Sequence, residues 1–196
     1  APQFPALDRE YRTLAYDVRG HGDSAGAYNG HTMDALVRDL ASFLDQVGVE
    51  RAHLAGVSMG GMIVQRFCLK HPRRAATITV ADSFPGRTDK SLIETFLYHA
   101  KLMRSQGLGA LFTYLLNNPA LPVGPDFSVP LELMEMYQDN FMKNDPMSLA
   151  GFTQMFTAMR DWSEDLREVR CPALLIAGDQ DAPCLGPMES MHRIIP

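Results

Sequence analysis

The stretch that most constrains this chain runs from His53 to Met62, where an apolar segment of strand length leads to a serine between small residues. Gly56, Ser58 and Gly60 form a Gly-x-Ser-x-Gly pattern, and a helical pattern follows at once. A strand, a tight turn and a helix in this order lift the serine hydroxyl out of a sheet. A Cβ two residues before or after the serine would crowd this strained turn, and glycine removes the crowding. The stretch therefore predicts an exposed nucleophile at residue 58, beside helix N–H groups that can stabilise an oxyanion.

The composition indicates a folded domain, because 46% of the 196 residues are hydrophobic and 21% are charged. A mildly acidic net charge of −5, with no basic block, argues against nucleic acid as the main partner. No run of about 18 apolar residues occurs, so no membrane span is predicted. The cysteines are odd in number and lack metal-ligand spacing, so we expect no metal, and free thiols in a reducing, cytoplasmic compartment. They are Cys68, Cys171 and Cys184.

Strand and helix patterns alternate along the chain, which predicts a parallel sheet flanked by helices. The helical patterns include one that begins after an N-cap at Thr32, one that begins after Ser58, and one over 186–195. Helical crossovers place the C-terminal ends of parallel strands on one edge, so the loops bearing Ser58 and Asp181 should meet there. The expected strands are the apolar, aromatic and β-branched runs at 11–17, 53–57, 76–81 and 173–177.

The chain changes character near residue 86. Between 87 and 162 no strand pattern occurs, and the helical segments are broken by glycine and proline. Met-rich helices form adaptable apolar surfaces. We therefore expect a helical cap at 87–162 over an apolar substrate pocket, inserted between two core segments at 1–86 and 163–196. Seven of the twelve methionines fall in this cap, namely Met103, Met134, Met136, Met142, Met147, Met155 and Met159.

Three motifs occur in a characteristic order: YDVRGHGDS at 16–24, GVSMGG at 56–61 and CPALLIAGDQD at 171–181. On these motifs the chain resembles the α/β-hydrolase superfamily, in the branch of small serine esterases, enol-lactonases and cofactor-free haloperoxidases. The resemblance covers almost the whole chain. It implies an α/β fold with a mostly parallel sheet, a serine nucleophile, an acid and a histidine after later strands, and no cofactor.

The resemblance assigns roles to individual residues. Ser58 is the nucleophile, and the backbone N–H of Met59 contributes to the oxyanion hole because that residue follows the nucleophile. The family usually places the acid three residues after the strand-ending glycine, which is Asp181; Asp179 is an alternative that more often bonds its own turn. Asp82, at another strand end, is a third candidate, because some related hydrolases place the acid there.

The catalytic histidine of this family follows the last strand, and no histidine of the chain matches that position. His192 lies in a segment that matches the helix before that strand, and we expect it on a helix surface. His21 lies in an Arg-Gly-His-Gly turn, where the family has a structural histidine or an aromatic residue. His99 lies in the expected cap and is a candidate for substrate contact. We therefore expect the 196 residues by themselves to be inactive, for lack of the base.

The family also has a strand with a His-Gly loop that supplies the second oxyanion N–H, and no such stretch precedes Tyr11. In the family this strand lies between those that correspond to 11–17 and 53–57. These two would then face an empty slot and leave a row of unpaired backbone groups. We expect the fold to be incomplete at both ends, as the interior of a longer hydrolase or as a part completed by further polypeptide.

Two classes of function stay open. The first is a serine hydrolase that cleaves small, largely apolar carboxylic esters or lactones through an acyl-enzyme on Ser58. A serine in place of an aspartate argues against the dehalogenase and epoxide-hydrolase branches. The second is a non-catalytic ligand-binding or interaction protein on the same scaffold, which the lack of a base favours. The sequence does not define the oligomeric state.

Overall fold

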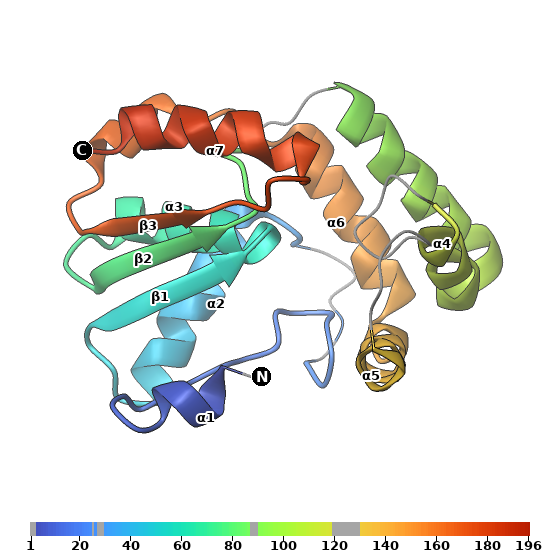
Figure 1. The fold of residues 1–196 in the computed structure, drawn as a ribbon, viewed down its shortest axis with the longest axis horizontal. Coiled ribbons are helices and arrows are strands. Elements are labelled where there is room, and N and C mark those ends of the chain that lie inside the picture. The colour runs from blue at the N-terminus through green and yellow to red at the C-terminus, as the bar shows by residue number, and fades with distance from the viewer. Residues whose placement is uncertain (1–2, 25, 27–29, 87–89, 119–129) are drawn as a thin grey trace.

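The computed structural model describes residues 3–24, 26, 30–86, 90–118 and 130–196. Within them three parallel strands form one sheet, in the order β1-β2-β3 (Figure 1). Val57 pairs with Ala81, and Ala81 pairs with Ile176, so the three strands end side by side. The prediction that the loops following these strands share one edge is confirmed. The strands are β1 (Ala52–Val57), β2 (Ala75–Ala81) and β3 (Ala173–Ile176).

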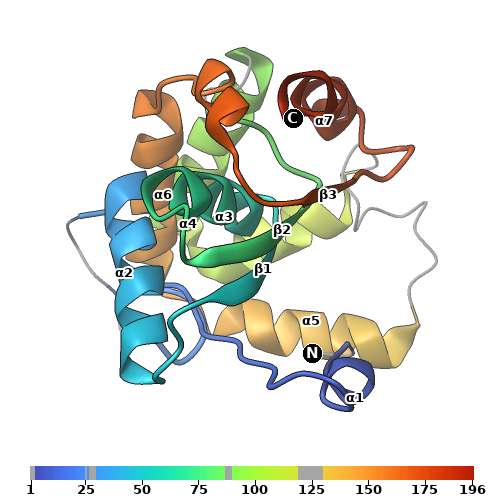
Figure 2. The same cartoon turned by 90° about the vertical axis from the view of Figure 1, so that its left-hand side faces the viewer.

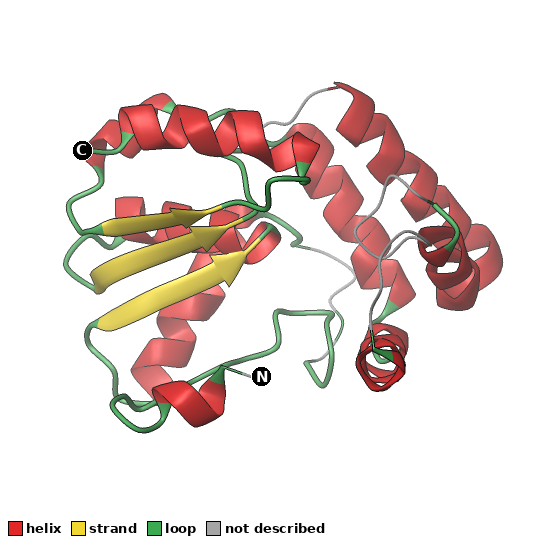
Figure 3. Cartoon of the chain, in the orientation of Figure 1, coloured by secondary structure: helices red, strands yellow, loops and turns green. Residues whose placement is uncertain are grey.

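Helices account for most of the remaining described residues (Figure 3). Thr32 caps α2 as predicted, because its hydroxyl accepts a hydrogen bond from the N–H of Ala35 at 3.1 Å. The last helix begins at Ala182, four residues earlier than its apolar spacing predicts. The helices are α1 (Phe4–Leu7), α2 (Met33–Gln46), α3 (Met59–Lys70), α4 (Lys90–Leu116), α5 (Leu131–Met142), α6 (Pro146–Ala158), the 3-10 helix η1 (Glu164–Glu168) and α7 (Ala182–Ile194).

The main core lies on one face of the sheet. Helix α3 packs on β1 and β2, and α2 packs on α3 (Figure 2). Full burial of an aliphatic or aromatic side chain of this kind stabilises a fold by about 1.5–3 kcal/mol. The side chains in this core with no exposed surface include Leu36, Met62, Phe67, Ile78, Leu166 and Met191.

Residues 11–17 form no strand, contrary to the prediction. Among the described residues β1 pairs on one side only, with β2. The segment lies near β1 through the ring of Tyr11, whose centroid is 5.7 Å from that of His53. A strand persists only where a neighbouring strand takes its backbone N–H and C=O groups, and no described strand does so here.

The other face of the sheet is open in the described part of the chain. Val57, Leu174 and Ile176 are 64%, 56% and 47% exposed on that face. Strand β2 is likewise fully buried on one face only: Ile78 and Val80 are fully buried, whereas the residues that alternate with them are half-buried. Among the described helices, α3 makes the main contacts with β1 and β2.

Helices α4, α5 and α6 lie between β2 and β3 in the chain and stand beside the sheet (Figure 1). Helix α4 packs on α6, and Gly107, with φ 81°, divides α4 into two helical pieces. The prolines expected to break helices at 119, 122 and 125 lie outside the described residues. These helices have a hydrophobic cluster of their own, formed by Ala100, Leu102, Met103, Leu108, Leu111 and Ala150.

The two ends of this helical insertion meet. The N–H of Trp162 donates to the carbonyl of Pro85 at 3.1 Å. Gly86 has φ 94°, and a Cβ there would overlap the carbonyl of Arg160 and lie 2.6 Å from the Trp162 ring. Only glycine fits this close approach, so the chain leaves the sheet and returns to it at the same place.

No helix in the described ranges is long and apolar enough to span a membrane.

Candidate active site

Ser58 stands at the point where β1 ends and α3 begins. Its backbone has φ 52° and ψ −117°, a positive-φ conformation that a non-glycine residue adopts at a cost of about 1–3 kcal/mol. The surroundings hold it there: its N–H donates to the carbonyl of Ala81 at 3.0 Å, and its carbonyl accepts from the N–H of Met62 at 3.1 Å. The residue is exposed. The predicted strand, turn and helix around Ser58 are therefore present, with the serine accessible.

The glycines around Ser58 differ in what they permit. A Cβ on Gly56 would overlap the carbonyl of Gly60, so glycine is required at 56, as predicted. A Cβ on Gly60 itself would meet no described atom within 4 Å, so the expectation of crowding at 60 is wrong. Gly61 instead makes the second close approach, because a Cβ there would lie 2.6 Å from the Cβ of Ser83. The turn thus requires glycine at position 56, two residues before the serine, and at position 61, three residues after it.

The N-terminal turn of α3 lies directly next to Ser58, which is the N-cap residue of this helix. The N–H of Met59 belongs to the first turn, where a helix offers no acceptor of its own, and the helix dipole adds partial positive charge. This arrangement can stabilise a negative oxygen next to Ser58, which is the role predicted for Met59.

All three candidate acids lie in the loops that follow β2 and β3, at the same edge of the sheet as Ser58. Asp181 is half-buried and precedes α7 as its N-cap residue. Asp82 directly follows β2 with φ 40°, and its Oδ1 accepts a hydrogen bond from the N–H of Gly178 at 2.8 Å. Asp179 is exposed. Burial is the main cause that raises the pKa of the Cys184 thiol to about 12, and the nearby charge of Asp181 adds to it.

None of the six histidines, all of which lie in the described ranges, hydrogen bonds to the Ser58 hydroxyl. His21 lies within 3.2 Å of the carbonyl of Arg19, in its own turn. His192 is exposed on α7. His99 packs edge-to-face on Tyr114, with ring centroids 5.4 Å apart. Burial lowers the pKa of His99, and its Nε2 is buried with no hydrogen-bond partner among the described residues.

A buried polar network behind Ser58 was not foreseen from the sequence. The Ser83 hydroxyl donates to the carbonyl of Ser58 at 2.8 Å, and Nε2 of Gln65 donates to that hydroxyl at 3.4 Å. The indole N–H of Trp162 donates to Oε1 of Gln65 at 3.1 Å. Gln65 and Ser83 have no exposed surface. The sequence signal that could have indicated this network is a glutamine, Gln65, between the apolar residues of α3.

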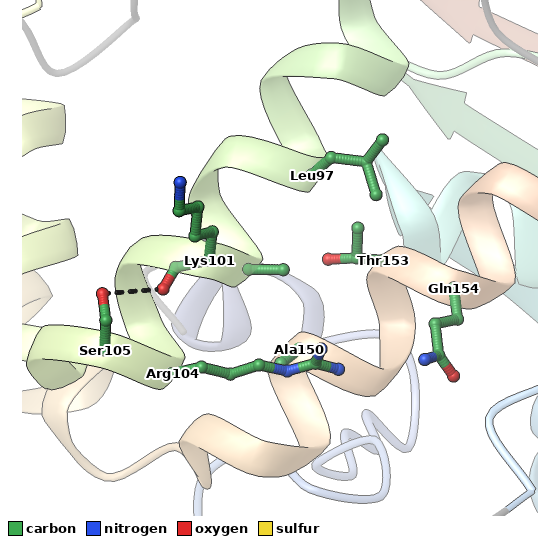
Figure 4. Close-up of a pocket in the computed structure, with 8 residues that line it drawn as sticks. Leu97, Lys101, Arg104, Ser105, Ala150, Thr153 and Gln154 are labelled. Carbon is green, nitrogen blue, oxygen red and sulfur yellow. Dashed lines mark hydrogen bonds between the residues drawn. The ribbon is translucent and has the colours of Figure 1, made fainter.

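Two cavities lie away from Ser58. One, of about 380 Å³, lies between α4 and α6, where Arg104 extends from α4 toward α6 and Lys101 points away (Figure 4). Its Ser105 hydroxyl donates back to the Lys101 carbonyl at 2.9 Å. The other, of about 540 Å³, lies between the start of α2, α6 and Trp162. Neither cavity includes Ser58 or the candidate acids.

The sheet order, the serine turn and the acidic loops at one edge define an α/β-hydrolase. The chain belongs to that superfamily, and its residues 7–189 match the family described as serine aminopeptidase, S33. It is 40% identical over 187 residues to 3-oxoadipate enol-lactonase 1 of Acinetobacter baylyi, covering 92% of this chain and 65% of that protein. It is 30% identical over 199 residues to the putative carbamate hydrolase RutD of a Caulobacter species, covering 99% and 71%. The crystal structure of the enol-lactonase from Burkholderia xenovorans is similar over all of this chain and 73% of its own, at 26% identity and a TM-score of 0.83.

Proposed function

We propose that the full-length protein hydrolyses small, largely apolar carboxylic esters or lactones through an acyl-enzyme on Ser58. The observation that carries the proposal is the Ser58 turn: an exposed serine held at positive φ, directly before the N-terminus of α3. The relatives add support, since they include proteins named as a carboxylesterase and as enol-lactonases. Fold alone does not select among these reactions.

The proposed reaction has two steps. A base takes the proton of the Ser58 hydroxyl, whose oxygen attacks the ester carbonyl, and the N–H of Met59 donates to the oxyanion that forms. The alcohol leaves with the proton and the acyl group stays on Ser58; in a lactone, the alcohol remains attached to the acyl chain. Water then attacks the acyl-enzyme and releases the carboxylic acid. In this proposal Asp181 orients the base, and the helices between 87 and 162 form a cap that bounds the substrate pocket.

A fluorophosphonate probe tests the proposal, because it labels only an activated serine. We expect the full-length protein to take up one label, Ser58→Ala to take up none, and the exposed-serine control Ser91→Ala to take up one. Intact mass counts the labels, and p-nitrophenyl ester turnover should follow the same pattern. A native protein that does not label would overturn the proposal and favour a non-catalytic ligand-binding protein. The 196-residue chain by itself is expected to show no turnover that depends on Ser58.

A further inference from the structure

We infer that Asp82 is a positioning residue, which holds the loop bearing Asp181 at a fixed place relative to the turn bearing Ser58. This inference rests on the proposed roles of Ser58 and Asp181. It concerns the segment 82–83, which directly follows the central strand β2 and therefore lies between the ends of β1 and β3.

The Ser58 side of this segment is fixed through Ser83. The Ser83 hydroxyl donates to the Ser58 carbonyl at 2.8 Å, and Ser83 has no exposed surface. A Cβ on Gly61 would lie 2.6 Å from that of Ser83, so the start of α3 and the segment touch without room to slide. Residue 82 is consequently fixed with respect to the nucleophile turn.

The Asp181 side is fixed through the carboxylate of Asp82. The N–H of Asp82 donates to the carbonyl of Ile176 at 2.9 Å, which extends the pairing of β2 with β3 by one residue. Its Oδ1 then accepts from the N–H of Gly178 at 2.8 Å. The carbonyl of Gly178 in turn accepts from the N–H of Asp181 at 3.1 Å, which closes the loop on itself. A hydrogen bond to a charged acceptor is about twice as strong as one between neutral groups.

The backbone of Asp82 explains why a short acidic residue stands there. Asp82 and Ser58 are the two non-glycine residues with positive φ in the described ranges, at 40° and 52°. Aspartate and asparagine tolerate this conformation better than most residues. The turn aims the carboxylate sideways at Gly178 rather than along the strand. Because that carboxylate is engaged by a backbone N–H, Asp82 supports the acid loop, and Asp181 remains the acid.

Three substitutions in the full-length protein separate the acceptor from the backbone conformation. Asp82→Asn keeps an acceptor and tolerates the left-handed backbone, Asp82→Gly removes only the acceptor, and Asp82→Ala removes the acceptor and adds strain. We expect kcat for ester turnover to fall about 10–100-fold in the glycine and alanine variants, with KM changed less than about 3-fold, and to stay within about 3-fold in the asparagine variant. Asp181→Asn should lower kcat by about a thousand-fold or more.

Two kinetic outcomes would overturn the inference. If Asp82→Asn is as inactive as Asp181→Asn, the charge of Asp82 acts directly and Asp82 is itself the acid. If the glycine and alanine variants keep the kcat of the parent protein, the bond to Gly178 positions nothing.

Amide hydrogen exchange at Gly178 gives a readout that does not depend on activity. We expect faster exchange in Asp82→Gly and Asp82→Ala, and parental protection in Asp82→Asn. Unchanged protection in the glycine variant would overturn the inference that the Asp82 carboxylate holds Gly178, whatever the kinetics show. If protection is lost in that variant but Ser58 of the parent protein takes up no fluorophosphonate, the proposed function is wrong and the inferred contact between Asp82 and Gly178 is still supported.

Discussion

The indole N–H of Trp162 donates to the side-chain oxygen of Gln65 at 3.1 Å, and both residues are almost completely buried. They are 97 residues apart in the sequence. Gln65 belongs to α3, which starts at the nucleophile turn, whereas Trp162 stands at the end of the helical insertion. This single hydrogen bond therefore ties the end of the insertion to the helix that follows Ser58.

A double-mutant cycle should measure the interaction free energy between Gln65 and Trp162. Gln65→Met leaves the Trp162 N–H without a partner, and Trp162→Phe leaves the Gln65 oxygen without one. Each should lower the free energy of unfolding by about 1–3 kcal/mol, because a buried polar group then loses its hydrogen bond. The double variant removes both groups, so its loss should be smaller than the sum of the single losses. Urea denaturation measures all four proteins, and strictly additive losses would show that the two side chains do not interact.

Two glycines of the nucleophile turn should respond oppositely to alanine. Gly56→Ala forces a Cβ into the carbonyl of Gly60, which should lower the free energy of unfolding by at least about 1–3 kcal/mol. Gly60→Ala places a Cβ in open space within α3, and should raise it by about 0.5–1 kcal/mol because alanine is the better helix former. Thermal unfolding of the pair checks this. Equal destabilisation by both substitutions would contradict the geometry described for the turn.

Asp145 should make the stability of the insertion depend on pH. It caps α6, and the hydrogen bond from the Ser148 hydroxyl, helped by the backbone N–H groups of Met147 and Ser148, lowers the pKa of its carboxyl. A lowered pKa stabilises the fold above the unfolded-state value of about 4, and this contribution is lost as pH falls through the folded value.

The cap contribution can be measured with two substitutions at Asp145. Asp145→Ala should cost about 1 kcal/mol at pH 7. Asp145→Asn keeps a neutral cap, so the advantage of the parent protein over this variant should shrink as pH falls below about 4. Urea denaturation from pH 7 to pH 3 measures the difference, and a difference that stays constant with pH would refute the assigned cause.

Local chemistry explains what could be predicted from the sequence. Some features depend on residues that are close together in the chain, so sequence patterns predict them. They are the Thr32 cap, the Ser58 turn and the ends of the three observed strands. The superfamily followed from motifs of the same local kind. The shared edge followed because helical crossovers force parallel strands to end together.

Features that depend on distant partners could not be predicted in this way. The 11–17 segment has strand-forming residues, yet its conformation depends on whether another strand lies beside it. Crowding at Gly60 was expected from the motif alone, whereas the real close approach, at Gly61, depends on Ser83. The partners of Gln65 are 18 and 97 residues away, and no local pattern reveals them.

The hydrogen bond between Trp162 and Pro85 has one more consequence. Because the helical insertion begins and ends at one place, where Trp162 bonds to Pro85, the register of the strands on either side does not depend on its length or sequence. A change in these helices is therefore expected to leave the geometry of the sheet unchanged. The same place marks the two positions, beside Gly86 and before Trp162, at which a foreign set of helices could be grafted.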